Sequence, residues 1–311
     1  MGKGILVIGS LNMDLSISMD AMPVVGETIL GNGLAYQAGG KGANQACAAG
    51  LLGGQVKMLG CVGQDEFGDR QVEGLKASGV DTSYIKRSKS QPTGTAVIYV
   101  DRRGNNSIVV IPGANRECGV QYLSSRRELF EWCGCIVLQM EIPDEAVLYA
   151  ARLGRELGKT VILNPAPAPD SLPDELLSLV DYLTPNETEL AKLSGSQGVD
   201  LESVKAGART LIRRGVRRVI VTMGSQGALL VSGDSERMYP ARKVAAVDTT
   251  AAGDCFNGAF AAALAEGKTE GEAVCFANAA AAIAVTREGA QSSIPTRAEV
   301  EGRCWQRAGC I

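Results

Sequence analysis

Histidine is absent from the 311 residues of the chain. Any general acid or base must therefore be an aspartate, glutamate, cysteine, lysine or tyrosine side chain. The same absence excludes serine–histidine triads and metal sites that depend on histidine ligands. Any proton transfer by a side chain of this protein must therefore use one of these five residue types.

The cysteines lack the paired spacing of a structural zinc site. The chain has nine of them, but no CxxC pair, and the closest two are Cys133 and Cys135. Structural zinc sites in proteins are built from such closely spaced pairs. Because no secretory signal precedes the chain, we expect free thiols.

Long hydrophobic runs are also missing. The apolar run Ile5–Ile8 is far shorter than the core of a signal peptide, and the alanine-rich stretch Ala277–Val285 is too short to span a bilayer. The net charge is −3 with mixed signs, which gives no indication of a nucleic-acid surface. We therefore expect a cytoplasmic protein that binds neither membranes nor nucleic acids.

Two common nucleotide-binding motifs do not occur. Lys41 lies in AGGKGANQA, but no serine or threonine follows it, so the phosphate loop GxxxxGK[ST] is absent. The first predicted strand is followed by GSLNMD and not by GxGxxG. These absences argue against P-loop NTPases and against simple dinucleotide-dependent dehydrogenases.

Buried-strand and helical patterns alternate along most of the chain. Hydrophobic residues make up 45% and charged residues 21%, as in soluble globular proteins. The alternation predicts one α/β domain over 1–311 with a doubly wound, mostly parallel sheet, whose ligands bind at the carboxyl ends of the strands. Strands are expected at 4–9, 56–62, 135–140, 160–163, 181–184, 219–222 and 228–231, and helices at 43–52, 67–78, 144–157, from 187, 201–214, 254–266 and 272–285.

Two stretches break this rhythm. Asp14–Asp20 alternates apolar and polar residues with period two, and Thr95–Asp101 and Ser107–Ile111 are joined by RRGNN, a hairpin signal. These strands predict a small antiparallel sheet, formed by inserted segments at about 14–38 and 93–112. Its remaining apolar face would cover a substrate or meet another subunit.

The stretch VDTTAAGDCFNGAF carries the clearest chemistry. Ala251, Ala252 and Gly253 lead into a helix that is expected to begin near Asp254. Small side chains leave the N–H groups of a helix N-terminus open to an anion such as phosphate. A carboxylate beside that phosphate can accept the proton of an attacking hydroxyl. The alternative is that Asp254 is only the N-cap of the helix.

Polar residues also follow the first strand and open the first helix. Asn12 and Asp14 in GSLNMD offer donors and acceptors suited to vicinal hydroxyls, although turn chemistry would also explain them. In AGGKGANQA, Gly40, Lys41 and Asn44 would allow a ligand to approach the backbone closely. The alternative there is a tight loop with a solvated lysine.

Three later strand ends contribute to the same edge. Glu141 in LQMEIP follows a buried strand, and Asn186 and Glu189 in TPNETE open another helix. This last pair could hold metal-bound water near phosphates, or Glu189 could simply cap its helix. The loop in VTMGSQGA is open enough for a nucleotide and offers Thr222, Gly224 and Gly227.

In combination, these motifs resemble those of the ribokinase-like, or PfkB, family of carbohydrate kinases. The similarity covers roughly residues 4–300, through GSLNMD, GGKGANQA, NPAPA, TPNETE, VTMGSQGA and VDTTAAGDCFNGAF to AVTREGAQSSIP. GGKGAN and DTTAAGDCFNG correspond to the two signature regions of the family.

The resemblance implies transfer of the ATP γ-phosphoryl group to the 5-hydroxyl of D-ribose. Asp254 matches the catalytic base of the family, and residues 251–253 match its anion hole. The positions that match the sugar-binding residues are Asn12, Asp14, Gly40, Lys41, Asn44, Glu141 and Asp254 itself.

The resemblance also implies a cofactor set and an assembly. Asn186 and Glu189 match the pair associated with magnesium and phosphate, the inserted sheet matches a lid that pairs two subunits in a homodimer, and activation by a monovalent cation, usually potassium, is expected. Asn278 stands where many members have a histidine against adenine. The nucleotide positions are Thr222, Gly224 and Gly227, and the cation ligands would come from Asp248, Thr250, Ala284, Arg287, Gly289 and Ser293.

Other functions remain open at this stage. A sibling kinase could act on 2-deoxyribose, another ketose or aldose, or a nucleoside, because few side chains decide the substrate. A non-catalytic sugar sensor could use the same fold, although it would not need the base or the anion hole. A dehydrogenase on a similar sheet is disfavoured by the missing glycine fingerprint.

Overall fold

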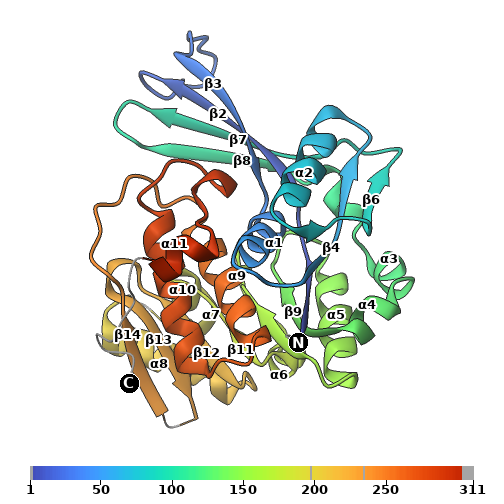
Figure 1. Cartoon of the computed structure of the whole chain (residues 1–311). Coiled ribbons are helices and arrows are strands. Elements are labelled where there is room, and N and C mark those ends of the chain that lie inside the picture. The colour runs from blue at the N-terminus through green and yellow to red at the C-terminus, as the bar shows by residue number, and fades with distance from the viewer. Residues whose placement is uncertain (1–2, 197, 234, 303–311) are drawn as a thin grey trace.

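The computed structural model describes residues 3–196, 198–233 and 235–302, and its main body is built around one large sheet (Figure 1). The strand order is β14-β13-β12-β11-β10-β9-β1-β4-β5, with β6 also pairing with β4. All pairings from β12 to β5 are parallel, whereas β12, β13 and β14 pair antiparallel. The strands are β1 (Gly4–Ile8), β4 (Val56–Gly63), β5 (Val80–Asp81), β6 (Ile85–Ser88), β9 (Cys133–Leu138), β10 (Thr160–Leu163), β11 (Tyr182–Leu183), β12 (Arg218–Thr222), β13 (Gly227–Ser232) and β14 (Ser235–Pro240).

Helices cover both faces of this sheet, which confirms the predicted doubly wound α/β fold. Two apolar clusters fill the space between the layers, one on each face. The first cluster involves α1 (Lys41–Leu51), α2 (Glu66–Ala77), α9 (Ala252–Ala265), α10 (Glu270–Ala284) and α11 (Arg297–Gly302). The second involves α3 (Val120–Ser124), α4 (Arg127–Trp132), α5 (Asp144–Glu156), α6 (Asp174–Leu179), α7 (Glu187–Ser194) and α8 (Leu201–Arg213).

Helices α1 and α9 approach each other unusually closely because small residues line their contact. A Cβ atom at Gly258 of α9 would lie 2.5 Å from both the Ala48 Cβ and the Gln45 carbonyl oxygen of α1. Only glycine therefore fits at Gly258 without a shift of the backbone. The close approach brings the first turn of α1 beside the first turn of α9, where the polar motifs lie.

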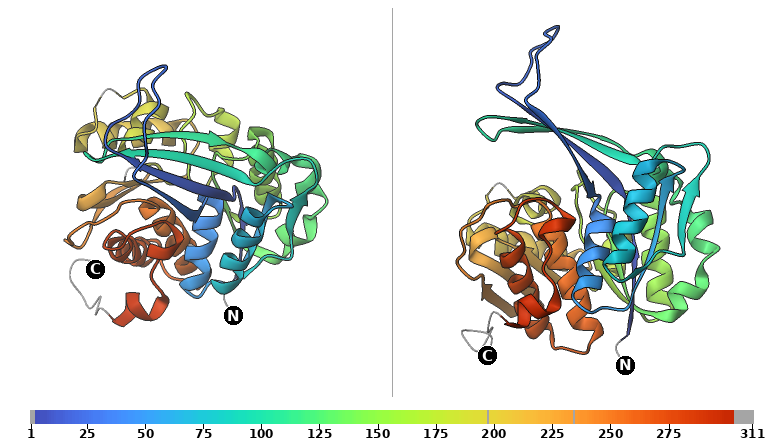
Figure 2. Two further views of the ribbon diagram at one scale, coloured as in Figure 1. Left: turned by 90° about the horizontal axis from the view of Figure 1, so that it is seen from above. Right: turned by 45° about the horizontal axis from the view of Figure 1, so that its top comes forward.

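The predicted insertion forms a separate four-stranded sheet, called the lid sheet here. Its strands are β2 (Asn12–Met19), β3 (Gly33–Gly39), β7 (Gly94–Asp101) and β8 (Asn106–Ile111), in the order β3-β2-β7-β8. The β2–β3 and β7–β8 pairs are antiparallel, while the central β2–β7 pair is parallel. Figure 2 shows the lid sheet extending away from the main body, with the β2–β3 connection reaching farthest.

The outer strands of the lid sheet expose large apolar side chains. Every residue of β8 is exposed, including Ile108 and Val110, and so are Leu34 and Tyr36 of β3. Apolar surface of this kind marks a site for a partner or a ligand.

The expectation of free thiols is confirmed for six of the described cysteines and is wrong for Cys275. Cys47, Cys61, Cys118, Cys133, Cys135 and Cys255 are buried free thiols, whereas Cys275 is disulfide-bonded, and Cys304 and Cys310 lie outside the described residues. Over the described ranges, no group of three or more Cys, Asp or Glu side chains could hold a metal ion. None of the described helices is both long and apolar enough to cross a membrane.

Candidate active site

Helix α9 begins with an open cluster of backbone N–H groups. Its N-cap is Ala251, in the left-handed region at φ 57°, and the Ala252 N–H donates to the Thr249 carbonyl oxygen at 3.2 Å. Within the described chain, the N–H groups of Gly253 and Asp254 have no hydrogen-bond partner. With only small side chains around them, these groups form a cradle for an anion.

Asp254 lies in the first turn of α9 and is not its N-cap, so the simple capping alternative does not hold. Its carboxylate is only 6% exposed and points at α1 instead of at its own helix. Asn44 Nδ2 donates to Asp254 Oδ2 at 3.0 Å, and Gln45 Nε2 donates to Asp254 Oδ1 at 2.9 Å. Both carboxylate oxygens are thereby held by neutral amides.

The start of α1 depends on a glycine. Gly40 is its N-cap at φ 87°, and a Cβ atom there would lie 2.6 Å from the Asn12 backbone nitrogen. Both the positive φ and the contact exclude larger residues. Gly40 thus lets the base of β2, at Asn12, and the first turn of α1 meet.

A cavity of about 180 Å³ lies in front of the α9 cradle. It brings together predicted residues from α1, α7, β12 and α9, which are far apart in the sequence. These are Lys41, Asn186, Glu189, Thr222, Ala251, Ala252, Gly253 and Asp254.

Lys41 and Glu189, which line this cavity, and Asp14, which does not, have shifted pKa values. The pKa of Asp14 is raised from 3.8 to about 7, mainly by burial and then by the carboxylates of Glu141 and Asp254, against the charge of Lys41. Burial alone would lower the pKa of Lys41, but nearby carboxylates, Asp254 foremost, raise it. Burial also raises the pKa of Glu189, although the Asn186 N–H and Lys41 oppose this. Such clustered shifts are typical of functional sites.

A second cavity, of about 330 Å³, lies between the lid sheet and the main body. Asn12 and Glu141 line it, together with Val110 from β8. Glu141 Oε2 accepts from Ser10 Oγ at 2.5 Å and from the Lys41 N–H at 3.2 Å. The second cavity therefore adjoins the first through Lys41, and the lid sheet forms one of its walls.

Asn186 and Glu189 form a capping box at the start of α7. Asn186 Oδ1 accepts from the Glu189 N–H at 2.8 Å, and Glu189 Oε2 accepts from the Asn186 N–H at 2.9 Å. The predicted capping alternative is thus present. It leaves Glu189 Oε1 without a partner among the described residues, and both side chains line the cavity.

Three predicted nucleotide positions do not line either of the two cavities. Gly224 begins the 3-10 turn η2 (Gly224–Gln226) and is exposed. At Gly227, φ is 107° and a Cβ atom would lie 2.1 Å from the Tyr239 carbonyl oxygen, so glycine is needed for strand pairing. Asn278 is buried in α10 and donates from Nδ2 to the same Tyr239 oxygen at 2.9 Å.

Of the predicted cation ligands, Thr250 and Gly289 are bonded to Asp248. Asp248 Oδ1 accepts from the Thr250 N–H at 2.8 Å, and Oδ2 accepts from the Gly289 N–H at 2.9 Å. Although burial alone would raise it, the pKa of Asp248 is lowered by these bonds. The Ala284 carbonyl oxygen accepts from the Arg287 N–H at 3.0 Å, and Ser293 lies in η3 (Gln291–Ser293) nearby in sequence. The Arg287 side chain is occupied by Glu299.

Sequence reasoning overlooked a set of buried polar residues behind the site. Ser10, Gln45, Gln139, Asn164 and Asn257 connect the predicted residues through hydrogen bonds. All five lie inside motifs that were recognised, GSLNMD, GGKGANQA, LQMEIP, NPAPA and DCFNGAF. Their position within those motifs was the available signal.

Comparisons with known proteins agree with this geometry. The model of the "pfkB family carbohydrate kinase" matches residues 3–297. The chain is 41% identical to a ribokinase of Haemophilus influenzae, over 96% of this chain and 97% of that protein. It is 39% identical to a deoxyribokinase of Salmonella typhi, over 94% and 95% of the two chains.

A solved structure is also closely similar. The structure of Arabidopsis thaliana ribokinase complexed with ribose and ATP superposes with a TM-score of 0.91 at 35% identity, covering 97% of this chain and 98% of that one. The family model, the relatives and the solved structure each match nearly the whole length of this chain. The chain therefore belongs to the pfkB family of carbohydrate kinases.

Proposed function

We propose that the protein transfers the γ-phosphoryl group of ATP to the 5-hydroxyl of D-ribose, giving D-ribose 5-phosphate and ADP. The observation that carries this proposal is the position of the Asp254 carboxylate, held by two amides beside the open N–H groups of α9. The name of the Haemophilus relative and the ribose and ATP bound to the Arabidopsis protein support it.

In this proposal Asp254 is the general base. It accepts the proton of the ribose 5-hydroxyl as that oxygen bonds to the γ-phosphorus and the bond from phosphorus to the ADP oxygen breaks. The open N–H groups of Gly253 and Asp254 stabilise the charge on the transferred group. No histidine is needed, because positioning and charge stabilisation provide most of the rate enhancement in phosphoryl transfer.

The sugar would occupy the 330 Å³ cavity and reach Asp254 with its 5-hydroxyl. Asn12, Asp14, Glu141 and Asn44 are the hydroxyl partners in this proposal, while Gly40 allows the close approach and Lys41 stands at the junction with the phosphate side. The Oδ1 of Asn12 is oriented by Asn115 Nδ2 at 2.7 Å, which fixes the direction in which Asn12 presents its amide.

Magnesium and nucleotide would be held on the other side. Asn186 and Glu189 would bind magnesium-coordinated water, for which the unpartnered Glu189 Oε1 is suited, and bound Mg²⁺ neutralises phosphate charge. Thr222 lines the phosphate cavity. Gly224, Gly227 and Asn278 are proposed to border the more distant parts of the nucleotide.

A monovalent cation, K⁺, would be bound beside Asp248. Carbonyl oxygens are the ligands that replace the hydration shell of K⁺. The backbone bonds of Asp248 bring Thr250 and Gly289 together, and Ala284, Arg287 and Ser293 add further oxygen atoms from the same segment. Because this cluster directly precedes the α9 cradle, an ion there would fix the conformation of residues 248–253.

The exposed strands of the lid sheet would pair two subunits. Apolar side chains of β3 and β8 would be buried in a homodimer, because a monomer leaves them in water. Each subunit of this dimer would be a single domain over 1–311, with the lid sheet as an insertion.

The test is ADP release from the purified protein with ATP and Mg²⁺, on D-ribose, 2-deoxy-D-ribose, D-fructose and adenosine, each with K⁺ and with Na⁺. Ribose turnover that K⁺ increases would support both the sugar and the cation proposal. Because of the similarity to a deoxyribokinase, 2-deoxyribose is the second candidate. Turnover on another sugar would keep the mechanism and overturn only the substrate; ribose binding without any turnover would favour a sensor.

A further inference from the structure

The Asp254 carboxylate is oriented by a side chain that does not itself line either cavity. Gln45 of α1 is completely buried, and its Nε2 donates to Asp254 Oδ1 at 2.9 Å. Asn44 holds the other oxygen, so the plane of the carboxylate is defined by one donor on each side. Gln45 is absent from the linings of both cavities, so it acts on the reaction through the side chains that it bonds, Asp254 and Asn164.

The Gln45 amide is itself fixed in one orientation. Gln139 Nε2 donates to Gln45 Oε1 at 2.8 Å, and Gln45 Nε2 also donates to Asn164 Oδ1 at 3.1 Å. One acceptor and two donor positions of the amide are thus all used. The reversed amide would point its oxygen at the Asp254 carboxylate, which is unfavourable.

The same chain of hydrogen bonds reaches the phosphate cradle. Asn164 Nδ2 donates to the Thr184 carbonyl oxygen at 2.9 Å, and Thr184 Oγ1 donates to Asn257 Oδ1 at 2.6 Å. Asn257 Nδ2 donates to the Gly253 carbonyl oxygen at 2.8 Å. The network therefore begins at the Asp254 carboxylate and ends on the residue beside it, and a connected buried network of this kind is rigid.

Gln139 has a buried polar atom whose lack of a partner lowers the stability of the fold. Its Oε1 is buried with no donor among the described residues and lies against Gly9, where a Cβ atom would be only 1.9 Å away. A buried acceptor without a donor destabilises a protein by about 1–3 kcal/mol. An apolar side chain would avoid that penalty but would leave Gln45 Oε1 without its donor.

We infer that Gln45 is a positioning residue for phosphoryl transfer, and that Gln139 supports it from behind. Gln45 directs Asp254 Oδ1 and leaves the carboxylate facing the sugar hydroxyl, in fixed relation to the cradle. This inference rests on the proposed function, because it assigns Asp254 the role of base.

The experiment compares Gln45→Met, which removes the donor, with Gln45→Glu, which keeps the shape but places an acceptor against Asp254. Both should lower kcat about 10- to 100-fold, as expected for a misplaced catalytic group. The ribose KM, and the ribose Kd from calorimetry, should stay within about twofold, since Gln45 does not contact the sugar. Gln139→Met, one step farther away, should lower kcat less than Gln45→Met does.

Gln71→Met is the matched control. Gln71 of α2 is also completely buried, and its Nε2 donates to the carbonyl oxygens of Asn12 and Gly39 without contacting Asp254. This control should raise the ribose KM and leave kcat nearly unchanged. If both glutamines were merely structural, Gln45→Met and Gln71→Met would instead show the same loss of thermal stability and of kcat.

Several outcomes would overturn the inference. They are a Gln45→Met variant with kcat within twofold of the parent, a Gln45→Glu variant with parental turnover, and, if neither of these folds, a Gln139→Met variant with unchanged kcat. If the parent protein phosphorylates no sugar, the proposed function fails by itself. The orientation of the Asp254 carboxylate in crystals of Gln45→Met then decides the inference, and an unchanged orientation contradicts it.

Discussion

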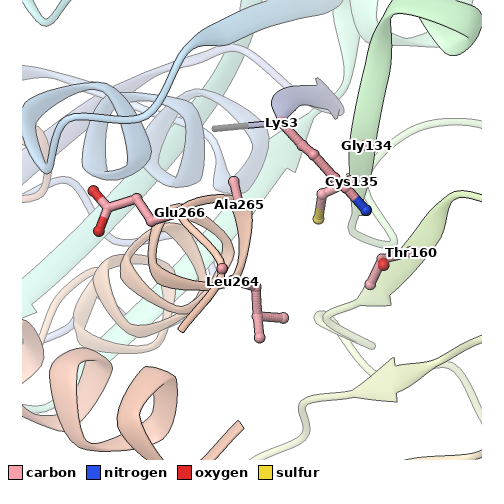
Figure 3. A pocket seen from close by; sticks show the side chains of 8 residues that line it. Lys3, Gly134, Cys135, Thr160, Leu264, Ala265 and Glu266 are labelled. Carbon is pink, nitrogen blue, oxygen red and sulfur yellow. The ribbon is translucent and has the colours of Figure 1, made fainter. Parts of the chain in front are cut away.

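The two ends of α9 open onto two different cavities at opposite edges of the main sheet. Its N-terminus faces the 180 Å³ cavity with Lys41 and Asp254, while its C-terminus, at Leu264–Gly267, borders a cavity of about 360 Å³ (Figure 3). The larger cavity lies where β9 and β10 begin and is lined by Lys3, Cys135 and Thr160 as well. Because the candidate active site is the smaller of the two cavities, size alone does not identify it.

What separates them is the direction of the chain. At the edge where parallel strands end, helices begin, and their free N–H groups and positive dipole ends point at a ligand. At the opposite edge α9 presents carbonyl oxygens, and Glu266 there is paired with Lys268 and Arg297. Only the first edge combines N–H donors for an anion with a buried carboxylate that could act as a base beside it.

The largest effect is expected from Asp254→Asn. It removes the proposed base but keeps a side chain of the same shape, so kcat should fall about 10²- to 10⁴-fold while the fold and ribose binding persist. Steady-state kinetics, circular dichroism and calorimetry measure these three properties. Asp144→Asn, the same change in the exposed first turn of α5, is the control and should be silent. Near-parental turnover of Asp254→Asn would remove Asp254 as the base.

A pH dependence of sugar binding is expected from Asp14, whose pKa is about 7 because of burial, Glu141 and Asp254. As the pH falls from 8 to 6 the carboxyl group becomes protonated, so it loses its charge and one of its oxygens becomes a donor, which weakens its acceptance of sugar hydroxyls. Ribose affinity should therefore fall about tenfold over that range. The contribution of Asp14 to folding stability has the opposite sign: it is complete below pH 3.8 and is lost as the pH rises through 7.

Asp14→Asn tests this assignment. The variant should bind ribose with an affinity that changes little between pH 6 and 8, as measured by calorimetry. Asp20→Asn, on an exposed residue just beyond β2, should keep the pH dependence of the parent. A dependence that survives Asp14→Asn would point to Glu189, whose pKa is also raised by burial.

A smaller effect is expected from Gly253→Ala. A Cβ atom there meets no protein atom within 4 Å, so the fold accepts it, and alanine in place of glycine stabilises a helix by about 0.5–1 kcal/mol. The added methyl group would nevertheless crowd the phosphate cradle, and kcat/KM for ATP should fall roughly tenfold. Gly119→Ala, at another open glycine before α3, is the control. Unchanged ATP kinetics would mean that phosphate does not contact this turn.

The smallest effect is expected at the opposite edge. Thr160→Val replaces a hydroxyl by a methyl group of similar size in the 360 Å³ cavity. Turnover and both KM values should stay within about twofold of the parent. A larger change would show that the cavity at the C-terminal end of α9 also serves the reaction.

Much of the fold could be predicted because buried parallel strands are continuous apolar runs, as in GILVI and CIVL. The edge strand β14, with the sequence SERMYP, was not expected, since one of its faces is exposed and its charges conceal the alternation. Likewise α3 and α4, of five and six residues, are too short to show a helical period.

The site was predictable to the extent that its residues carry their own signal. Small residues before Asp254 indicate an open cradle whatever surrounds them. The requirement for glycine at Gly227, in contrast, comes from the Tyr239 carbonyl oxygen, which is close only after β13 and β14 pair. Gln45 and Gln139 lie within recognised motifs, but nothing in the sequence distinguished them there, because the role of a glutamine depends on the partners that folding brings to it.

The network around Gln45 has a consequence for the order in which the protein assembles. Its hydrogen bonds join residues separated by 94, 119 and 209 positions, which lie on α1 and α9 and directly after β9 and β10. Contacts of such long range form only after large loops have closed, which makes them slow and late. During refolding, helical content should therefore recover before turnover does, and no fragment that ends before α9 can carry the activity.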